Sequence, residues 1–310
     1  MSPIRLALVG LGKIARDQHL PAIAATPGIE LVAIASRNAA LDGIACYASL
    51  DELLAKMPDI DAVALCTPPQ VRRAQAAAAL EAGKHVLLEK PPGATVSEIA
   101  PLVAEADRTG KTLFATWHSR FAPAVEPARA FLAEHAPRSV AIEWKEDVRV
   151  WHPGQDWIWE PGGLGVFDPG INALSILTRI LPYQVFLTKA ELYFPANRAA
   201  PIAADLDFSD ALGLAVRAEF DFRQTGPQTW DIRVETDAGV LTLSSGGAQL
   251  VHDGRPLIAA SEAEYAGIYR HFVNLVGRGA SDVDLTPLAH VADAFMLGRR
   301  NIVEPFEDRP

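Results

Sequence analysis

The first 120 residues alternate short apolar runs with helical stretches, and this alternation constrains the fold more than any other feature. Each apolar run has the length of a buried parallel strand and is too short for a globular helix. The runs are Ile4–Val9, Glu30–Ser36, Ile44–Tyr47, Asp61–Cys66, His85–Leu88 and Thr112–Trp117. The helical stretches are Ile14–Thr26, Ser49–Met57, Gln70–Ala82 and Thr95–Thr109. This pattern predicts βαβ units in a doubly wound parallel sheet, an α/β domain over residues 1–120.

The pattern changes after about residue 139, where strands follow one another with few helices between them. Several of these runs alternate apolar and polar residues, which suits a mostly antiparallel sheet with one wet face. The predicted strands are Ser139–Val150, Gln184–Phe194, Leu212–Phe222, Thr229–Thr236 and Val240–Ser244. The predicted helices are Ala124–Glu134, Leu174–Leu181, Ala263–Arg278 and Pro287–Arg300. We therefore expect a second, α+β domain over residues 121–310, with the last helices free to pack back on the first domain.

Composition excludes several classes of protein. With 49% hydrophobic and 21% charged residues, the chain has apolar surface for a core and no signature of intrinsic disorder. A net charge of −10 without a basic cluster argues against nucleic acid and anionic membranes as partners. The two cysteines, Cys46 and Cys66, make neither a disulfide framework nor a cysteine zinc site, so we expect no metal. No apolar run reaches the roughly 18–20 residues of a membrane span, and we expect a cytoplasmic protein.

A glycine-rich loop follows the first strand and opens the first helix. It has the form G-x-G-x-x-A, with Gly10 for the tight turn, Gly12 for close approach of the backbone to a pyrophosphate, and Ala15 for packing of the helix on the strand. The helix N-terminus adds free N–H donors and the positive end of its dipole. The loop therefore predicts a Rossmann dinucleotide site, to which Lys13 and Ile14 also contribute.

The end of the second strand indicates which dinucleotide binds. An acidic residue there would bind the ribose 2′-hydroxyl of NAD, but this strand ends in Ser36-Arg37. A hydroxyl and a guanidinium suit a 2′-phosphate. The residues favour NADP, with NAD also usable.

Further polar residues follow the later strands of the same sheet, at the edge where ligands of doubly wound sheets bind. Thr67-Pro68 follows the fourth strand, Glu89-Lys90 the fifth, and His118 the sixth. We expect the first two pairs to border the cofactor, with Lys90 facing it.

The second half holds a segment in which tryptophans alternate with polar residues. Four of the six tryptophans lie between residues 144 and 159, and Glu146 and His152 lie among them. Indole faces stack on the C–H faces of sugars, and carboxylates hold hydroxyls. Farther on, Asp168 and Asn172 are four residues apart, so on a helix they share one face. Because Asp168 precedes a proline, a helix N-cap and a catalytic role fit its local sequence equally well.

These motifs together resemble the glucose–fructose oxidoreductase/inositol dehydrogenase (Gfo/Idh/MocA) family. The resemblance is carried by Gly10–Ala15, Glu89-Lys90-Pro91, Gly162-Gly163 and Asp168-x-x-x-Asn172. Longer segments, Gly10–Ile23, Leu87–Thr95, Ala115–Arg120 and Glu143–Ile176, resemble the branch of L-arabinose and D-galactose 1-dehydrogenases. The resemblance implies a Rossmann domain followed by an α+β domain with an open, mostly antiparallel sheet. It also implies a homodimer contact through that sheet.

The resemblance implies that Lys90, Asp168 and Asn172 line the reacting carbon. The wider family usually has histidine at position 172, and a neutral amide cannot act as a base. The base is then Asp168 or Lys90. The implied reaction is NAD(P)-dependent oxidation of an aldose (L-arabinose, D-galactose or D-fucose) at C1 to the aldonolactone. The candidates for the remaining substrate contacts are His118, Glu146, Trp151, His152 and Trp230.

Two alternatives remain open. One is another sugar or polyol dehydrogenase of the same family. The other is a non-catalytic sensor of NADP and sugar, although a pure sensor has no need for both Lys90 and Asp168.

Overall fold

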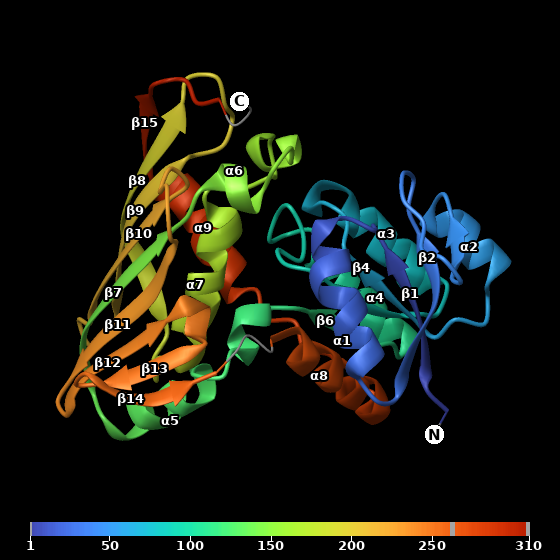
Figure 1. The fold of residues 1–310 in the computed structure, drawn as a ribbon, viewed down its shortest axis with the longest axis horizontal. Helices are drawn as coiled ribbons and strands as arrows, with labels where there is room; N and C mark the ends of the chain where they lie inside the picture. Colours follow the sequence, from blue (N-terminus) through green and yellow to red (C-terminus); the bar gives the residue numbers. More distant parts are fainter. Residues whose placement is uncertain (1, 261–263, 308–310) are drawn as a thin grey trace. The chain divides into compact units, whose positions relative to one another are not determined.

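The structure is a computed structural model that describes residues 2–260 and 264–307. The chain forms two compact units (Figure 1). The first takes the chain up to His118 together with Tyr265–Asp284, and the second takes Ser119 to Glu264 and the chain from Leu285 onward. One of the late helices thus belongs to the N-terminal unit. Ala263, where we expected that helix to begin, lies outside the described residues.

The first unit is built on a parallel sheet. Over the described residues this sheet has six strands in the order β3-β2-β1-β4-β5-β6, all paired in parallel. Its strands are β1 (Ile4–Val9), β2 (Ile29–Ala35), β3 (Ala45–Tyr47), β4 (Ala62–Leu65), β5 (His85–Leu88) and β6 (Leu113–Ala115). Its helices are α1 (Leu20–Ala25), α2 (Leu50–Lys56), α3 (Pro69–Glu81), α4 (Ala100–Thr109) and α8 (Glu264–Arg278). The predicted doubly wound parallel sheet is confirmed.

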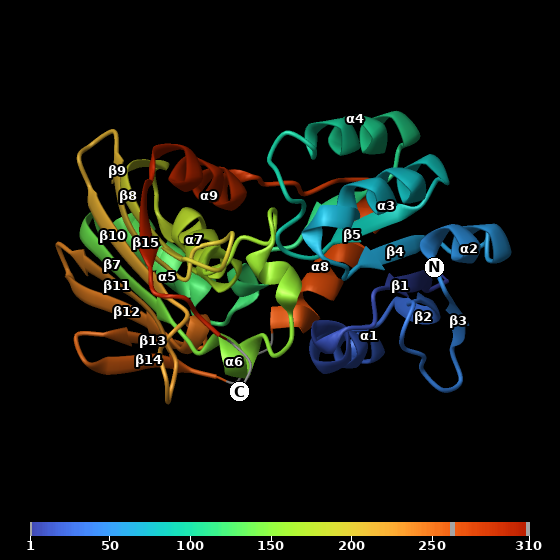
Figure 2. The ribbon, with the colours of Figure 1, turned by 90° about the horizontal axis from the view of Figure 1, so that it is seen from above.

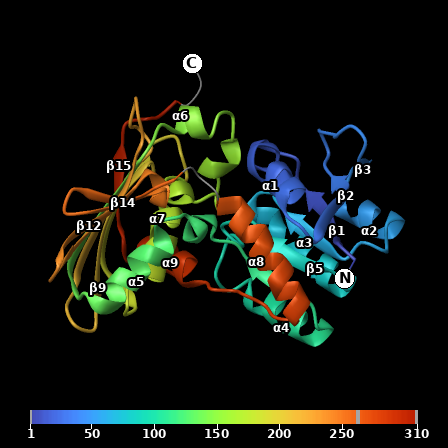
Figure 3. The same ribbon diagram turned by 60° about the horizontal axis from the view of Figure 1, so that its bottom comes forward.

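Helix α8 is joined to this sheet by side chains and by the backbone that follows it. Figure 3 brings α8, drawn in orange, to the front. The Phe272 ring stacks on Phe114 of β6, with centroids 6.4 Å apart. After the helix, the backbone carbonyl of Asp282 accepts a hydrogen bond of 2.9 Å from the N–H of Ala115. Apolar packing and backbone pairing therefore add a late segment of the chain to the N-terminal sheet.

Two helix predictions in this unit were wrong in detail. The stretch 14–26 is not one α-helix, because Ala15–His19 forms a π-helical turn before α1. Helix α4 begins at Ala100 rather than Thr95. The reason lies in Glu98, whose carboxylate accepts a hydrogen bond of 3.1 Å from the Thr95 N–H and holds the preceding residues in turns.

The second unit is built on a mixed, mostly antiparallel sheet with helices on one face (Figure 2). In the described part of the chain it has nine strands, in the order β14-β13-β12-β11-β7-β10-β9-β8-β15. Pairs β7–β10 and β8–β15 are parallel and the others antiparallel. The strands are β7 (Pro137–Lys145), β8 (Val185–Pro195), β9 (Ala203–Asp210), β10 (Ala215–Asp221), β11 (Thr229–Thr236), β12 (Gly239–Ser244), β13 (Gln249–His252), β14 (Arg255–Ala259) and β15 (Arg299–Val303). The helices are α5 (Val125–Glu134), α6 (Val148–Trp151), α7 (Phe167–Ile180) and α9 (Thr286–Leu297).

The side chains of this sheet alternate as expected for one covered and one exposed face. In β7, Val140, Ile142 and Trp144 are buried, whereas the residues between them are more exposed. The predicted α+β class with an open, mostly antiparallel sheet is confirmed.

Several boundaries in this unit differ from the predictions. The strand expected over 139–150 ends at Lys145, because the Asp147 carboxylate accepts the Arg149 N–H and starts α6. Helix α7 begins at Phe167 rather than Leu174. The last helix ends at Leu297, and Arg299–Val303 pairs with β8 as β15. Strands β9, β13 and β14 were not predicted, although each pairs with a neighbouring strand in the sequence. Strand β15 was not predicted because it pairs with β8, which is distant in the sequence.

Candidate functional site

The glycine loop has the geometry that a dinucleotide cradle requires. Gly10 has φ of 92°, and a Cβ there would lie 3.0 Å from the backbone nitrogen of Thr67. A Cβ on Gly12 would meet nothing within 4 Å, so the backbone at this position is open to an incoming group. Ala15 is fully buried, as close packing of the helix requires. The loop therefore fits a bound pyrophosphate.

The other predicted loop residues lie at the surface. Lys13 is exposed and forms an ion pair with Asp17 one turn later. Ile14 is 39% exposed. Beyond β2, the Ser36 N–H donates to the carbonyl of Tyr47 at 2.9 Å, and Arg37 is exposed. These positions can receive a phosphate-bearing ligand.

A buried arginine that the sequence analysis missed ties together the loops after β4 and β5. Arg72 of α3 is 3% exposed. Its Nη1 donates to the carbonyls of Glu89 and Pro91, and its Nη2 donates to the carbonyl of Thr67. One guanidinium therefore sets the path of both loops, which include Pro68 and Lys90. A fork of donors at fixed angles suits this task, but local sequence gives no signal for it.

Glu89 lies in a buried polar network of the first unit. Its Oε1 accepts a hydrogen bond of 2.8 Å from the Tyr265 hydroxyl and lies 3.3 Å from Nε2 of His19. Its Oε2 accepts the Lys90 backbone N–H at 2.5 Å. On the other side, His19 Nδ1 lies 2.7 Å from the Tyr269 hydroxyl. The carboxylate predicted to border the cofactor is thus engaged by its own unit.

The charges in this network oppose the effect of burial. Burial alone would raise the pKa of Glu89, but the hydrogen bond from His19 and the nearby cationic groups lower this pKa to about 2. Burial would lower the pKa of His19, yet Cys66, Tyr269 and Glu89 raise it well above its usual value. Burial raises the pKa of Tyr269 to about 12. The pKa of Glu89 is thus lowered and the pKa of His19 is raised, and both shifts are in the direction that favours an ion pair.

Lys90 and His118 follow β5 and β6 in the same unit, and both are half-buried. The Lys90–Pro91 peptide is cis. The His118 ring stacks on Tyr265, with centroids 5.3 Å apart and planes at 21°.

In the second unit, three predicted residues from different elements meet. His152, just after α6, places Nε2 3.4 Å from Oε1 of Glu146 and 3.8 Å from Oδ2 of Asp168. Glu146 follows β7 and Asp168 is in the first turn of α7; they are 2% and 3% exposed. We call these three residues the carboxylate–histidine cluster. Buried groups that can accept, donate or move a proton are typical of catalytic and sugar-binding sites.

Two of the predicted tryptophans border this cluster. The Trp230 Nε1–H donates to Glu146 Oε2 at 2.9 Å. The Trp151 ring, 37% exposed, lies against Trp230 with centroids 4.9 Å apart. Trp144 stacks behind Trp230 at 5.9 Å and is buried, so it belongs to the core. Trp151 and Trp230 thus form an indole wall beside acidic groups.

Asp168 and Asn172 both lie on α7, one turn apart. The N-cap of α7 is Val166, and Asp168 lies within the first turn of the helix. The N-cap alternative for Asp168 was therefore wrong. Asn172 is half-buried, and its backbone carbonyl accepts a hydrogen bond of 2.7 Å from the Ser175 hydroxyl.

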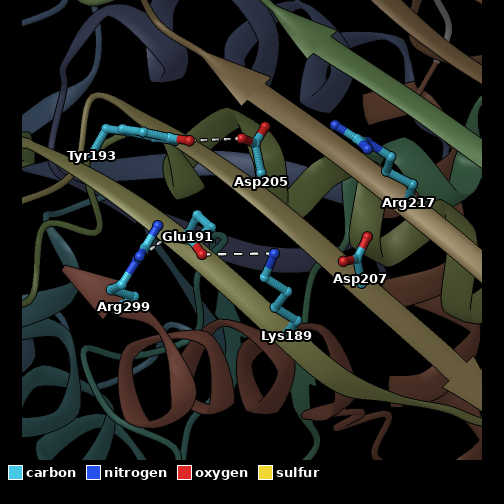
Figure 4. A pocket seen from close by; sticks show the side chains of 7 residues that line it. All are labelled: Lys189, Glu191, Tyr193, Asp205, Asp207, Arg217 and Arg299. Atoms are coloured by element: carbon cyan, nitrogen blue, oxygen red, sulfur yellow. Dashed lines mark hydrogen bonds and ion pairs between the residues drawn. The ribbon is translucent and has the colours of Figure 1, made fainter. Parts of the chain in front are cut away.

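A separate hollow of about 260 Å³ lies on the open face of the second sheet (Figure 4). The side chains that line it are Lys189, Glu191, Tyr193, Asp205, Asp207, Arg217 and Arg299. Several pair with one another: the Tyr193 hydroxyl donates to Asp205 at 2.9 Å, and Arg299 Nε donates to Glu191 at 2.7 Å. None of the predicted site residues lines it.

Over 2–260 and 264–307, no three or more His, Cys, Asp or Glu side chains are grouped so that they could hold a metal ion. No helix in that part of the chain combines the length and apolarity needed to span a membrane. Cys46 and Cys66 are both free thiols.

Known proteins resemble the chain over its whole length. Residues 4–116 match an oxidoreductase family with an NAD-binding Rossmann fold, GFO_IDH_MocA. The galactose 1-dehydrogenase of Pseudomonas fluorescens is 50% identical over 308 residues, which are 99% of this chain and 100% of that protein. The crystal structure of a D-galactose-1-dehydrogenase from Rhizobium etli superposes with a TM-score of 0.95 at 60% identity, covering 99% of both chains.

A more distant structure is similar in fold alone. A 3-ketoreductase from Actinomadura kijaniata, solved with TDP-benzene and NADP, gives a TM-score of 0.83 at 21% identity, covering 97% of this chain and 100% of that one. The family match of the Rossmann unit and the two relatives matched over their full length place the chain among known oxidoreductases: it belongs to the Gfo/Idh/MocA family.

Proposed function

We propose that this protein oxidises D-galactose at C1 to the aldonolactone, with NADP preferred over NAD. L-Arabinose and D-fucose share the C1–C4 configuration of D-galactose, so we expect them to react as well. The carboxylate–histidine cluster beside the indole wall of Trp151 and Trp230 carries this proposal. The names of the two relatives at 50% and 60% identity support it.

The second unit supplies the groups that bind the sugar. Asp168 accepts the proton of the C1 hydroxyl, since a carboxylate is a competent base and the amide of Asn172 is not. Asn172 orients the same hydroxyl. Glu146 and His152 hold other hydroxyls, and the indole wall packs on the C–H face of the ring.

The first unit supplies the cofactor site and a cation. The loop Gly10–Ala15 and the helix N-terminus after it hold the pyrophosphate. Thr67 and Pro68, in the loop held by Arg72, border the cofactor. When bound, NAD(P) supplies the hydride acceptor for C1. Lys90 donates a hydrogen bond to the C1 oxygen and stabilises charge there.

The proposed preference for NADP depends on Ser36 and Arg37. No carboxylate ends β2, and the exposed Arg37 is available to a 2′-phosphate. Arg37→Ala should lower the ratio of kcat/KM for NADP over NAD by about tenfold. Lys13→Ala is the matched control, because it removes an exposed cation from the glycine loop, which we propose holds the pyrophosphate that both cofactors share. It should affect both cofactors alike.

The direct test is the growth of NAD(P)H absorbance with a panel of aldoses and polyols, each run with both cofactors. We expect turnover with D-galactose and L-arabinose, faster with NADP, and a lactone product. D-Glucose, which differs from D-galactose at C4, is the matched control. Turnover with a polyol alone would discard oxidation at C1. No turnover with any compound of the panel, in a protein that still binds NADPH, would favour the sensor alternative.

We also propose a homodimer through the open face of the second sheet. That face carries both signs of charge, as Lys189, Asp207 and Arg217 illustrate, so a copy related by a two-fold axis can complement it. Sedimentation at micromolar concentration tests this. A monomer would contradict it, and Arg217→Glu should weaken the dimer.

A further inference from the structure

One tyrosine of α8 contacts residues that follow two strands of the first unit, Glu89 after β5 and His118 after β6. The Tyr265 hydroxyl donates to Glu89 Oε1 at 2.8 Å, across 176 positions in the sequence. The Tyr265 ring stacks on His118 with centroids 5.3 Å apart and planes at 21°. Tyr265 is 5% exposed, so both contacts are sheltered from water.

Glu89 links Tyr265 to Lys90 through its two carboxylate oxygens. Glu89 Oε2 accepts the backbone N–H of Lys90 at 2.5 Å. Arg72 holds the carbonyls on either side, those of Glu89 and Pro91. The Lys90 backbone is therefore held on its N–H side by a carboxylate whose other oxygen is bound by Tyr265.

We infer that Tyr265 is a positioning residue, which sets the backbone of Lys90 through Glu89 and the ring plane of His118 by stacking. This inference rests on the proposed function of Lys90 and His118. Tyr265 acts through those two residues and needs no contact of its own with substrate or cofactor. Small displacements of a group that touches the reacting atoms are costly, since a shift of about 1 Å can reduce the rate about 100-fold.

The same helix offers a matched control. Tyr269 lies one turn after Tyr265 and is fully buried. Its hydroxyl also belongs to the network, since it lies 2.7 Å from His19 Nδ1. Its hydroxyl reaches His19 rather than the Glu89 carboxylate, and its ring faces that of His19 edge-on. Tyr269→Phe thus removes a buried hydroxyl of the same helix whose hydrogen bond goes to His19 and not directly to Glu89 or Lys90.

The experiment compares Tyr265→Phe with Tyr269→Phe in the full-length enzyme with NADP bound. Two readouts are taken: kcat and KM for D-galactose, and hydrogen exchange of the Lys90 amide. Pro91 and Pro92 carry no N–H, so along the chain the Lys90 amide is followed by no other exchangeable backbone amide until that of Gly93. Tyr265→Phe should lower kcat about tenfold and speed this exchange about tenfold, with KM within about twofold. Tyr269→Phe should leave kcat and the exchange rate of the Lys90 amide within about twofold of the wild type. It should lower the Tm to an extent similar to that of Tyr265→Phe.

A third variant, Tyr265→Leu, removes the stacking on His118 as well and should lower kcat further than Tyr265→Phe. Unchanged Lys90 exchange in Tyr265→Phe overturns the inference, and so does equal loss of kcat in the two phenylalanine variants. Lys90→Ala is measured in parallel. If it keeps full turnover with D-galactose, or if the wild type has none, the proposed function fails, and the exchange readout still decides whether Tyr265 positions the Lys90 backbone.

Discussion

Each unit of the protein buries a glutamate beside a histidine, and the two pairs differ in how the carboxylate is engaged. In the first unit, Glu89 accepts short hydrogen bonds of 2.8 Å from Tyr265 and 2.5 Å from the Lys90 backbone, with His19 at 3.3 Å. In the second unit, His152 lies 3.4 Å from Glu146 and 3.8 Å from Asp168. In both units the histidine thus lies beyond the roughly 3.2 Å limit of an ordinary N–H···O hydrogen bond. The difference is in the other contacts: both oxygens of Glu89 accept short hydrogen bonds, whereas Glu146 accepts one, of 2.9 Å, from the Trp230 Nε1–H to its Oε2.

The difference separates a structural use of buried charge from a chemical one. A carboxylate held by short hydrogen bonds inside one unit is fixed, and here it fixes the backbone of Lys90. In the second unit, His152 lies near Glu146 Oε1 and Asp168 Oδ2 at 3.4 and 3.8 Å, and we propose that these two oxygens receive hydroxyl groups of a substrate. The two glutamates are equally buried, at 3% and 2% exposed, so neither burial nor residue type of the glutamate distinguishes the two uses.

The largest expected effect is at Asp168. Asp168→Asn keeps the size of the side chain and removes the proposed base, so kcat with D-galactose should fall about 1,000-fold. Dissociation of NADPH, measured by fluorescence, should be unchanged. Asp147→Asn is the matched control, because that carboxylate caps α6 and binds Arg149 instead. Near-normal turnover in Asp168→Asn would show that the two carboxylate sites do not differ in chemical role.

The second prediction concerns stability at the other glutamate. Glu89→Gln leaves the buried His19 without its ionic partner, which should cost about 3 kcal/mol of unfolding free energy. The measurement is chemical denaturation at about pH 6. An unchanged unfolding free energy would contradict the structural role of Glu89.

The pH dependence of that difference gives a sharper form of the test. The pKa of Glu89 is lowered to about 2 in the folded protein from an ordinary value of 4.5. Its stabilising contribution is therefore complete above pH 4.5 and is lost as the pH falls toward about 2. Because the pKa of His19 is raised, its contribution is complete below pH 6.5 and is lost at higher pH. The stability gap between wild type and Glu89→Gln should thus be widest between pH 4.5 and pH 6.5 and narrow on both sides.

The third prediction separates fold from binding within the glycine loop. Gly10→Ala places a Cβ at positive φ and 3.0 Å from the Thr67 nitrogen, so it should destabilise the protein by about 2 kcal/mol. Gly12→Ala meets no neighbour within 4 Å and should leave stability nearly unchanged. Gly12→Ala should instead weaken the binding of NADPH, since the added methyl group occupies the space through which the pyrophosphate approaches the backbone. Calorimetry for stability and titration for binding check the pair, and equal loss of stability in both would refute it.

The smallest effect is expected at the donor to Glu146. Trp230→Phe retains an aromatic ring and removes the Nε1–H that donates to Glu146 at 2.9 Å. Loss of about 1 kcal/mol should raise KM for D-galactose about fivefold, with kcat within about twofold. Steady-state kinetics measure this, with Trp157→Phe as the control. A large loss of kcat with unchanged KM would mean that Glu146, like Glu89, is a positioning group.

Local patterns predicted the first unit better than the second. Strand β1 and strand β5 have the predicted bounds, because each parallel strand is a short apolar run between turns. The edge strands β14 and β15 were missed, because edge strands with mixed polarity have no local signature and exist only through pairing. Strand β13, which pairs with β12 and β14, was missed as well. The predicted residues Glu146, His152 and Asp168 do meet, although they lie on three different elements.

The sequence by itself determined the fold class, the glycine loop and the residue types of the candidate site, because periodicity, turn chemistry and motif spacing are local properties of the chain. Three-dimensional folding determined which charged groups share an environment. The partners of Glu89 come from α8 and from the turn before α1, and Arg72 reaches carbonyls of two loops. Such contacts depend on packing between segments far apart in sequence, and for that reason no local pattern separates the anchoring role of Glu89 from the chemistry proposed for Asp168.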